Sequence, residues 1–141
     1  MSNLFKNSKL IKNVQRDFDK RGQILSLVNT NIKNVSIITC NKNSIRSNHY
    51  HKKDWHYMYV LEGRINYFFK KINSPILNYK LVQKGDNIFT PPKEIHATHF
   101  PVKTILIVCS KNKRNKTNYE KDTVRIELIN INNLKKILTK R

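Results

Sequence analysis

Two stretches decide the fold of this chain: residues 43–63, NSIRSNHYHKKDWHYMYVLEG, and residues 85–96, GDNIFTPPKEIH. The first stretch places His49 and His51 two positions apart and adds His56 a few residues later. Side chains alternate along a β-strand, so residues two apart point to the same face and both imidazoles can meet inside a barrel. His96 ends the second stretch. We therefore expect four histidines to form one functional centre.

Outside these stretches the chain consists of short apolar runs rich in β-branched and aromatic residues. We predict strands over 24–28, 35–40, 55–61, 64–70, 77–82, 87–90, 104–109 and 123–129. Runs of five to seven residues separated by turn-forming residues are typical of an all-β barrel or sandwich. Residues 111–121 (KNKRNKTNYEK) carry no strand pattern, and we interpret them as a polar loop.

The length of 141 residues fits a single domain. We expect an N-terminal arm over residues 1–18, loose or added as an extra strand, and a barrel over 19–129. A basic amphipathic tail follows over 130–141. Apolar residues at 131, 134, 137 and 138 predict a short helix in this tail.

The charge of the chain is strongly positive, with 28 Lys+Arg against 9 Asp+Glu and a net charge of +19. Such a charge can attract nucleic acid, phosphorylated ligands or an anionic membrane. The basic residues are spread along the chain rather than gathered on one element, so we favour a compositional bias and do not expect a nucleic-acid partner.

The cellular location is suggested by the cysteines and by the start of the chain. Cys40 and Cys109 lie far apart in apolar runs, as expected for buried free thiols in a reducing compartment. The first residues contain no apolar signal region, and no segment approaches 18 apolar residues. We expect a cytoplasmic protein with no membrane span.

The histidine cluster has two chemical interpretations. Imidazole is the commonest transition-metal ligand, so His49, His51, His56 and His96 can hold a divalent transition metal such as Zn, Fe, Mn or Ni. An imidazole without a metal is instead a good general base near neutral pH. Purely structural histidines are the third reading, which the convergence of four such residues disfavours.

The same residues resemble the two cupin motifs. The first motif is matched by His49, His51 and Gly63, and the second by Gly85, Pro91 and His96. The chain departs from the motifs at several positions: Asn43 and Lys93 replace glycines, Phe100 replaces an asparagine, and His56 stands at the glutamate position. This resemblance implies a single-domain cupin, a double-stranded β-helix or jelly-roll barrel, followed by the short C-terminal helix.

Within the cupins, the chain is similar to enzymes of sugar-nucleotide metabolism. Residues 46–51 (RSNHYH) resemble the Arg-Gly-x-His-x-His segment of dTDP-4-keto-6-deoxyhexose 3,4-ketoisomerases, with Ser47 in place of glycine. Residues 19–22 and 122–125 are similar to motifs of the same ketoisomerases and of dTDP-4-dehydrorhamnose 3,5-epimerase-like proteins. An Asn-His-Tyr-His segment like residues 48–51 holds a metal in the cupin domain of capsular-polysaccharide reductases.

The resemblance implies proton abstraction next to the ketone of a nucleotide-linked keto-deoxysugar, by an isomerase or epimerase. His49 or His51 would be the base. If a metal occupies the histidines, acid/base duty falls to a tyrosine among Tyr57, Tyr59 and Tyr67, of which we single out Tyr59. A diphosphate-linked substrate also needs cations at the barrel mouth. The candidates are Arg46, Lys52, Arg64 and Arg125.

Two other functions remain open at this stage. A histidine centre without a carboxylate is compatible with an iron-dependent dioxygenase-type cupin. A non-catalytic cupin that binds a small ligand is the third possibility. Exposed sheet edges need covering, so we expect a homodimer in which the N-terminal arm adds or exchanges a strand.

Overall fold

The computed structural model describes residues 5–12 and 14–140, and most of them lie in antiparallel strands. The strands are β1 (Lys9–Ile11), β2 (Gln15–Asp19), β3 (Gly22–Ser26), β4 (Asn34–Cys40), β5 (Ser44–His51), β6 (His56–Glu62), β7 (Arg64–Lys71), β8 (Asn78–Gln83), β9 (Asn87–Thr90), β10 (Glu94–Phe100), β11 (Thr104–Ser110) and β12 (Thr123–Arg125). The helices are α1 (Lys116–Asp122) and α2 (Ile131–Thr139). The predicted all-β class with a C-terminal helix is confirmed.

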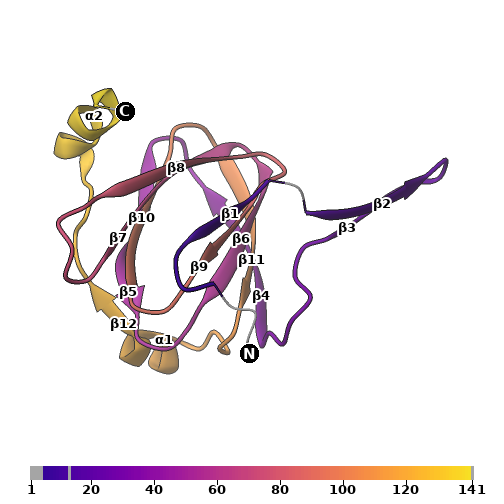
Figure 1. Cartoon of the computed structure of the whole chain (residues 1–141), viewed down its shortest axis with the longest axis horizontal. Helices are drawn as coiled ribbons and strands as arrows, with labels where there is room; N and C mark the ends of the chain where they lie inside the picture. Colours follow the sequence, from indigo (N-terminus) through magenta and orange to yellow (C-terminus); the bar gives the residue numbers. More distant parts are fainter. Residues whose placement is uncertain (1–4, 13, 141) are drawn as a thin grey trace.

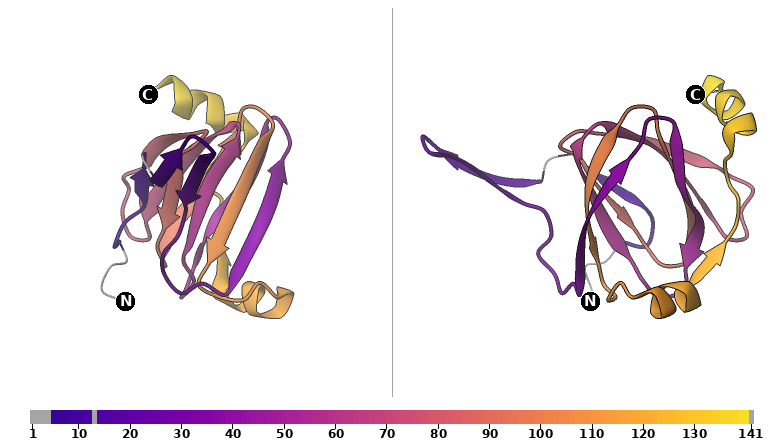
Figure 2. Two further views of the ribbon diagram at one scale, coloured as in Figure 1. Left: turned by 90° about the vertical axis from the view of Figure 1, so that its right-hand side faces the viewer. Right: turned by 180° about the vertical axis from the view of Figure 1, so that it is seen from behind.

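The strands form two five-stranded sheets that face each other and enclose the barrel interior (Figures 1 and 2). The first sheet has the order β1-β9-β6-β11-β4, and the second has the order β12-β5-β10-β7-β8. β2 and β3 pair only with each other within the described residues, and their hairpin projects away from the barrel. Helix α1 lies at one end of the barrel (Figure 1).

The main core lies between the sheets, where the alternating side chains of both inner faces meet. On β6, Met58 and Val60 point inward, and Leu106 and Val108 do so on β11. Burial of each such side chain contributes about 1.5–3 kcal/mol. The buried cluster consists of Cys40, Met58, Val60, Ile65, Tyr67, Phe69, Val82, Ile88, Phe100, Leu106 and Val108.

Helix α2 covers the outer face of the second sheet. Its N-terminus is capped by a reciprocal pair, in which the Asn130 side chain accepts from the Asn133 backbone and the Asn133 side chain accepts from the Asn130 backbone. Leu134, Ile137 and Leu138 pack against a second buried cluster of Phe68, Ala97 and Ile129. The predicted amphipathic helix is therefore present. No helix in the described part of the chain is long and apolar enough to span a membrane.

Three positions where the chain lacks an expected glycine keep a left-handed backbone. Asn43, Ser47 and Lys93 have φ angles of 67°, 71° and 61°. Glycine adopts this conformation without steric cost, whereas other L-residues pay about 1–2 kcal/mol and asparagine pays less. The left-handed conformation is thus kept without glycine at all three positions, and Lys93 is the residue least suited to it.

A β-bulge lies next to the histidines on β5. His96 pairs with His49 and the following Ala97 pairs with Ser47, so Asn48 is the extra residue. The Asn48 side chain accepts hydrogen bonds from the backbone of Leu128 at 2.8 Å and Ile129 at 3.0 Å. The segment after β12 therefore holds the bulge, and the bulge sets the direction of His49.

Several expected elements differ from the structure. Residues 111–121 are not entirely loop, because α1 starts at Lys116 with Asn115 as its N-cap. The last strand, β12, is shorter than the predicted 123–129. Strand β10 was not among the predicted strands, because its seven buried residues include polar ones and show no alternation.

The N-terminal arm was expected to be either loose or an added strand, and its described part contributes a strand. Its β1 pairs with β9, Lys9 lying opposite Phe89. The expected boundary between residues 18 and 19 falls inside the β2–β3 hairpin. Residues 1–4 and 13 of the expected arm, and residue 141 of the expected tail, lie outside the described residues.

Candidate active site

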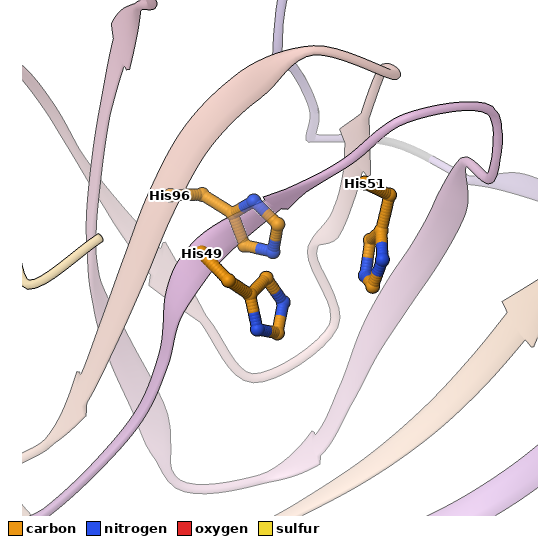
Figure 3. A group of neighbouring side chains, drawn as sticks. All are labelled: His49, His51 and His96. Carbon is orange, nitrogen blue, oxygen red and sulfur yellow. The ribbon is translucent and has the colours of Figure 1, made fainter. Parts of the chain in front are cut away.

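Three of the predicted histidines form a compact group inside the barrel (Figure 3). His49 and His51 come from β5, and His96 comes from the paired strand β10. The His49 ring centroid lies 4.6 Å from that of His51 and 4.7 Å from that of His96. One nitrogen of each ring lies within 4.8 Å of the others. The two-residue spacing thus produces the predicted convergence.

His56 does not belong to this group of three nitrogens. It lies on β6 of the first sheet, across the barrel from β5 and β10. Its ring centroid is 5.3 Å from that of His96 and 5.9 Å from that of His51. The His51 ring itself lies 5.9 Å from that of His96, so His56 borders the group from the facing sheet, and only the closer spacing of 4.8 Å between nitrogens sets the three other histidines apart.

Burial keeps the histidines neutral. Desolvation, with added repulsion from neighbouring imidazoles, lowers the pKa of His49 to about 2 and that of His96 to about 3. The same causes lower the pKa of His56 well below its usual value. Burial also lowers the pKa of His51, but the Asp122 carboxylate opposes that shift. Of the three grouped histidines, only His51 has a neighbouring carboxylate that favours its protonated form.

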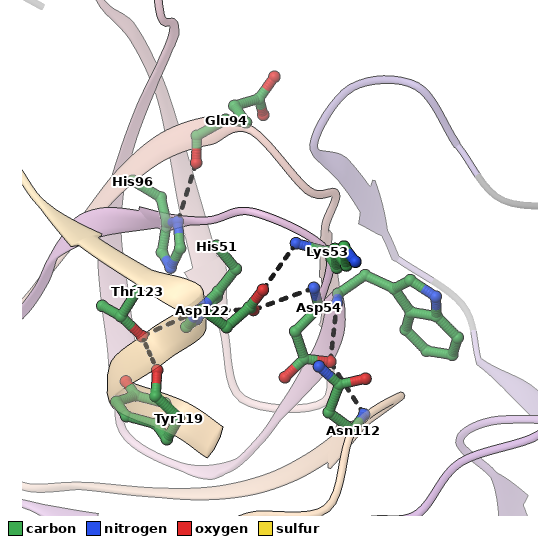
Figure 4. A network of polar contacts seen from close by, with 10 residues as sticks. His51, Lys53, Asp54, Glu94, His96, Asn112, Tyr119, Asp122 and Thr123 are labelled. Carbon is green, nitrogen blue, oxygen red and sulfur yellow. Dashed lines mark hydrogen bonds and ion pairs between the residues drawn. The ribbon is translucent and has the colours of Figure 1, made fainter. Parts of the chain in front are cut away.

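Hydrogen bonds select the nitrogen that each ring presents to the site. His96 Nδ1 lies 3.1 Å from the Glu94 carbonyl oxygen and donates to it, so its Nε2 carries the lone pair. That buried Nε2 has no hydrogen-bond partner among the described residues. His51 Nδ1 lies 3.4 Å from Thr123 Oγ1 and 3.7 Å from Asp122 Oδ2 (Figure 4). His51 therefore also presents an unprotonated Nε2.

Asp122 is held in place by the turn between β5 and β6. Its two carboxylate oxygens accept backbone hydrogen bonds from Lys53 at 2.9 Å and Asp54 at 3.1 Å. Asp122 is the last residue of α1, and Thr123 donates to the carbonyl of Tyr119 on the same helix. The two backbone hydrogen bonds thus hold the Asp122 carboxylate beside His51 without any contribution from a ligand.

A cavity of about 110 Å³ lies beside the histidines between the two sheets. It is lined by Ile38, Arg46, Ser47, His49, His51, Asp54, His56, Met58, Thr98, Phe100, Leu106, Val108, Ser110, Arg114 and Tyr119. Met58, Leu106 and Val108 share the first sheet's side of the cavity with His56, and His49 and His51 lie on the second sheet's side. The cavity therefore offers both polar and apolar contacts to a small ligand.

Asp54 is a buried carboxyl that lines this cavity. Burial raises its pKa to about 6, although backbone hydrogen bonds from Asn112 and Trp55 partly oppose the shift. Its Oδ1 accepts both bonds, at 3.0 Å and 2.9 Å. Asp54 thereby links the β5–β6 turn to the segment that precedes α1.

The predicted cations divide into one that reaches the cavity and three that do not. Arg46 lines the cavity and donates to the Thr39 carbonyl at 3.2 Å. Arg64 begins β7 just after β6 ends, so the length of β6, roughly 20 Å, separates it from His56. Arg125 forms a two-bond ion pair with Glu120, both bonds 2.9 Å long. Lys52 lies exposed in the β5–β6 turn and does not line the cavity.

The structure does not bring Tyr59 to the histidines. His56 and Met58 line the cavity, so strand alternation turns Tyr57 and Tyr59 to the other face of β6. Tyr67 is inside the barrel, but its hydroxyl is taken up by Ser8 and Thr90, each at 2.7 Å. Burial raises its pKa further above its usual value.

Sequence reasoning missed the residues that α1 and its flanks contribute. They are Arg114, Tyr119, Asp122 and Thr123, to which Asp54 is added from the β5–β6 turn. Asp122 and Thr123 had been noted as part of a resemblance over residues 122–125, in which only Arg125 was given a role. No spacing rule relates these positions to the histidines, because only the tertiary fold brings α1 to them.

The fold of this chain matches those of solved structures, although comparisons at the level of sequence find no relative. No protein-family model matches the chain, and no curated protein matches it. Solved structures do match. One is QdtA, a sugar 3,4-ketoisomerase from Thermoanaerobacterium thermosaccharolyticum in complex with TDP, with a TM-score of 0.69 at 20% identity over 98% of both chains. The chain has a cupin-type fold.

Two further structures extend this comparison. A TDP-fucose-3,4-ketoisomerase from Campylobacter jejuni has a TM-score of 0.69 at 16% identity over 84% of this chain and 88% of its own. A dTDP-4-dehydrorhamnose 3,5-epimerase from Sulfolobus tokodaii has a TM-score of 0.70 at 19% identity over 89% of this chain and 80% of its own. The expected similarity of this chain to sugar-nucleotide cupins is confirmed at the level of the fold.

Proposed function

We propose that this cupin is an isomerase or epimerase that moves a proton next to the keto group of a nucleotide-linked deoxysugar. The observation that carries the proposal is the pairing of the neutral, buried His51 with the Asp122 carboxylate beside a small cavity. A base of this kind can remove a proton from carbon and be stabilised as the imidazolium. The enzymes named among the structural neighbours act on TDP-linked sugars, which supports this substrate class.

In an isomerisation that exchanges a ketone with a neighbouring hydroxyl, one proton moves from carbon to carbon and one from oxygen to oxygen. His51 Nε2 takes the carbon-bound proton, and the electron pair of that bond forms the carbon–carbon double bond of an enediolate. The hydroxyl proton passes to the neighbouring former keto oxygen of the enediolate, and His51 returns the carbon-bound proton to the adjacent carbon, which leaves the new ketone at the former hydroxyl carbon. His49 is neutral and lies beside His51 on β5, where it helps to orient the sugar.

Arg46 and Arg114 are the cations in the cavity wall that suit a diphosphate. The +19 charge of the chain favours the approach of any such anion. Lys52, Arg64 and Arg125 have no such place in the proposal. The sugar would enter the cavity, and the nucleotide would stay at its mouth.

The test is incubation with TDP-4-keto-6-deoxyglucose, the sugar nucleotide bound in one neighbouring ketoisomerase structure. NMR spectroscopy should show a shifted keto group, and in D₂O the carbon next to the ketone should acquire deuterium. A His51→Gln variant should lose both signals. Absence of both signals with the wild type, and of any thermal stabilisation by millimolar TDP- or UDP-sugars, would overturn the proposal.

As an alternative to His51 acting as a free base, we propose that the three grouped histidines hold a divalent transition metal, because a metal bound to His51 Nε2 would occupy the lone pair that removes the proton. The unpaired His96 Nε2 and the neutral His49 and His51 rings form a donor set that suits Zn, Fe, Mn or Ni. A bound ion would supply a Lewis acid that polarises the ketone. His56 stands outside this set, so metal uptake measured by elemental analysis should be lost in His96→Ala and kept in His56→Gln. Equal loss in both variants would restore the four-histidine set.

We further propose a homodimer that uses the outer face of the first sheet. Among the residues that the structure describes, β4 is an edge strand that pairs only with β11, and Val35 and Ile37 are largely exposed on it. Phe18 and Ile24 are equally exposed on the projecting hairpin. Unpaired edges and exposed apolar side chains are surfaces that a second copy can cover.

A further inference from the structure

Tyr119 is a cavity residue on an element that the sequence assigned to a polar loop. Its ring centroid lies 5.4 Å from that of His51 and 6.3 Å from that of His49. It lines the cavity from α1, while the histidines line it from β5. The tyrosine therefore faces the same space as the proposed base.

The position of the Tyr119 ring is fixed on two sides. The Arg114 guanidinium carbon lies 4.6 Å from the ring centroid, a cation–π distance. The backbone carbonyl of Tyr119 accepts from Thr123 Oγ1 at 2.6 Å, and Thr123 also contacts His51. The same short segment thus positions Tyr119 and supports the proposed base (Figure 4).

The hydroxyl of Tyr119, in contrast, makes no hydrogen bond with any residue in the described ranges 5–12 and 14–140. Tyr67 spends its hydroxyl on Ser8 and Thr90, and Tyr79 donates to Asn66. Arg46, another donor in the wall, is bonded to a backbone carbonyl. Tyr119 therefore offers a neutral donor that the protein itself leaves available.

We propose that Tyr119 is a catalytic residue whose hydroxyl donates a hydrogen bond to the keto oxygen of the substrate. The inference rests on the proposed function. When the carbon–hydrogen bond breaks, its proton goes to His51, its electron pair forms the carbon–carbon double bond, and the carbonyl π pair moves onto oxygen. The Tyr119 hydroxyl stabilises that developing charge, and no bond to Tyr119 is made or broken. A positioned donor of this kind contributes about 10²–10³ in kcat.

The experiment compares Tyr119→Phe, which keeps the ring and its contact with Arg114, with Tyr119→Ala, which removes both. Tyr50→Phe is the matched control, because strand alternation turns Tyr50 away from its neighbours His49 and His51 and it does not line the cavity. The readouts are kcat and KM with TDP-4-keto-6-deoxyglucose, deuterium uptake by that substrate in D₂O, Kd for TDP, and Tm.

Tyr119→Phe should lower kcat and deuterium uptake together, each by about 10²–10³, because both pass through the same enediolate. Its KM, Kd for TDP and Tm should stay within about twofold or a degree of the wild type, as should every readout of Tyr50→Phe. If Tyr119→Phe reacts at the wild-type rate and only Tyr119→Ala has a raised KM, Tyr119 merely lines the cavity. That result would overturn this inference and leave the proposed function intact. Failure of the wild type to react or exchange would overturn the proposed function and this inference with it.

Discussion

Replacing Asp122 by asparagine tests whether this carboxylate makes His51 a base. Two unit charges 3.7 Å apart interact by about 4.5 kcal/mol at an effective dielectric constant of about 20. The two backbone N–H groups of Lys53 and Asp54 already neutralise part of the Asp122 charge. We therefore expect about half of that energy, about 2 kcal/mol, to be lost from the protonated state of His51.

A loss of about 2 kcal/mol corresponds to roughly a 30-fold lower rate of proton removal. In Asp122→Asn the pKa of His51 falls further, because burial lowers it and the opposing carboxylate is gone. Since the neutral form of His51 is the active base, the acid limb of the kcat/KM profile should move to lower pH. Its plateau should fall at the same time, because a weaker base removes the proton more slowly.

Steady-state kinetics across pH measure both effects, and ¹⁵N spectra of the imidazole nitrogens report the His51 pKa directly. Glu120→Gln is the matched control: it makes the same acid-to-amide change on α1, at a residue that pairs with Arg125 instead. The asparagine amide cannot accept both backbone bonds, so some loss of Tm is expected. An unchanged plateau and an unchanged His51 pKa in Asp122→Asn would refute the reasoning.

Three further predictions concern stability and assembly. The free energy of unfolding should fall below pH 6.5, because the pKa values of His49, His56 and His96 are lowered and the unfolded chain binds protons that the folded chain does not. Each of these histidines lowers the free energy of unfolding by up to about 1.4 kcal/mol per pH unit. Asp54, whose pKa is raised to about 6, offsets the effect of one histidine between about pH 6 and 4. Urea titrations from pH 7.5 to 5 measure this, and a flat profile would contradict it. Lys93→Gly should raise the free energy of unfolding by about 1 kcal/mol by relieving a left-handed backbone at φ 61°, whereas the neighbouring Pro92→Gly should not. Ile37→Lys should convert a dimer into a monomer by light scattering and lower the Tm, because association stabilises the folded state, and a monomeric wild type would refute the proposed interface.

The sequence alone was sufficient for the barrel and for three of its central residues. Alternation along a strand is a local rule, so the His49–His51 spacing already predicted that both rings point inward. The short apolar runs predicted most of the strands for the same reason. β10 escaped this rule because all its residues are buried, including Glu94 and Thr98, and a strand buried on both faces shows no alternation.

The position of His56 could not be predicted, because its spacing from His51 places it on another strand but does not say which sheet that strand joins. The same limit applies to the tyrosines and cations. Tyr59 and Arg64 lie near the histidines in sequence, yet alternation turns one away and the length of β6 removes the other.

The histidine pair, the all-β class and the helical tail were determined by the sequence, because each depends on contacts between residues a few positions apart. The tertiary structure alone decided the rest of the site. It set His56 across the barrel, and it brought Asp122, Tyr119 and Arg114 to His51 through the packing of α1 against the β5–β6 turn. Those contacts join residues roughly 70 positions apart, and no local pattern records such pairings.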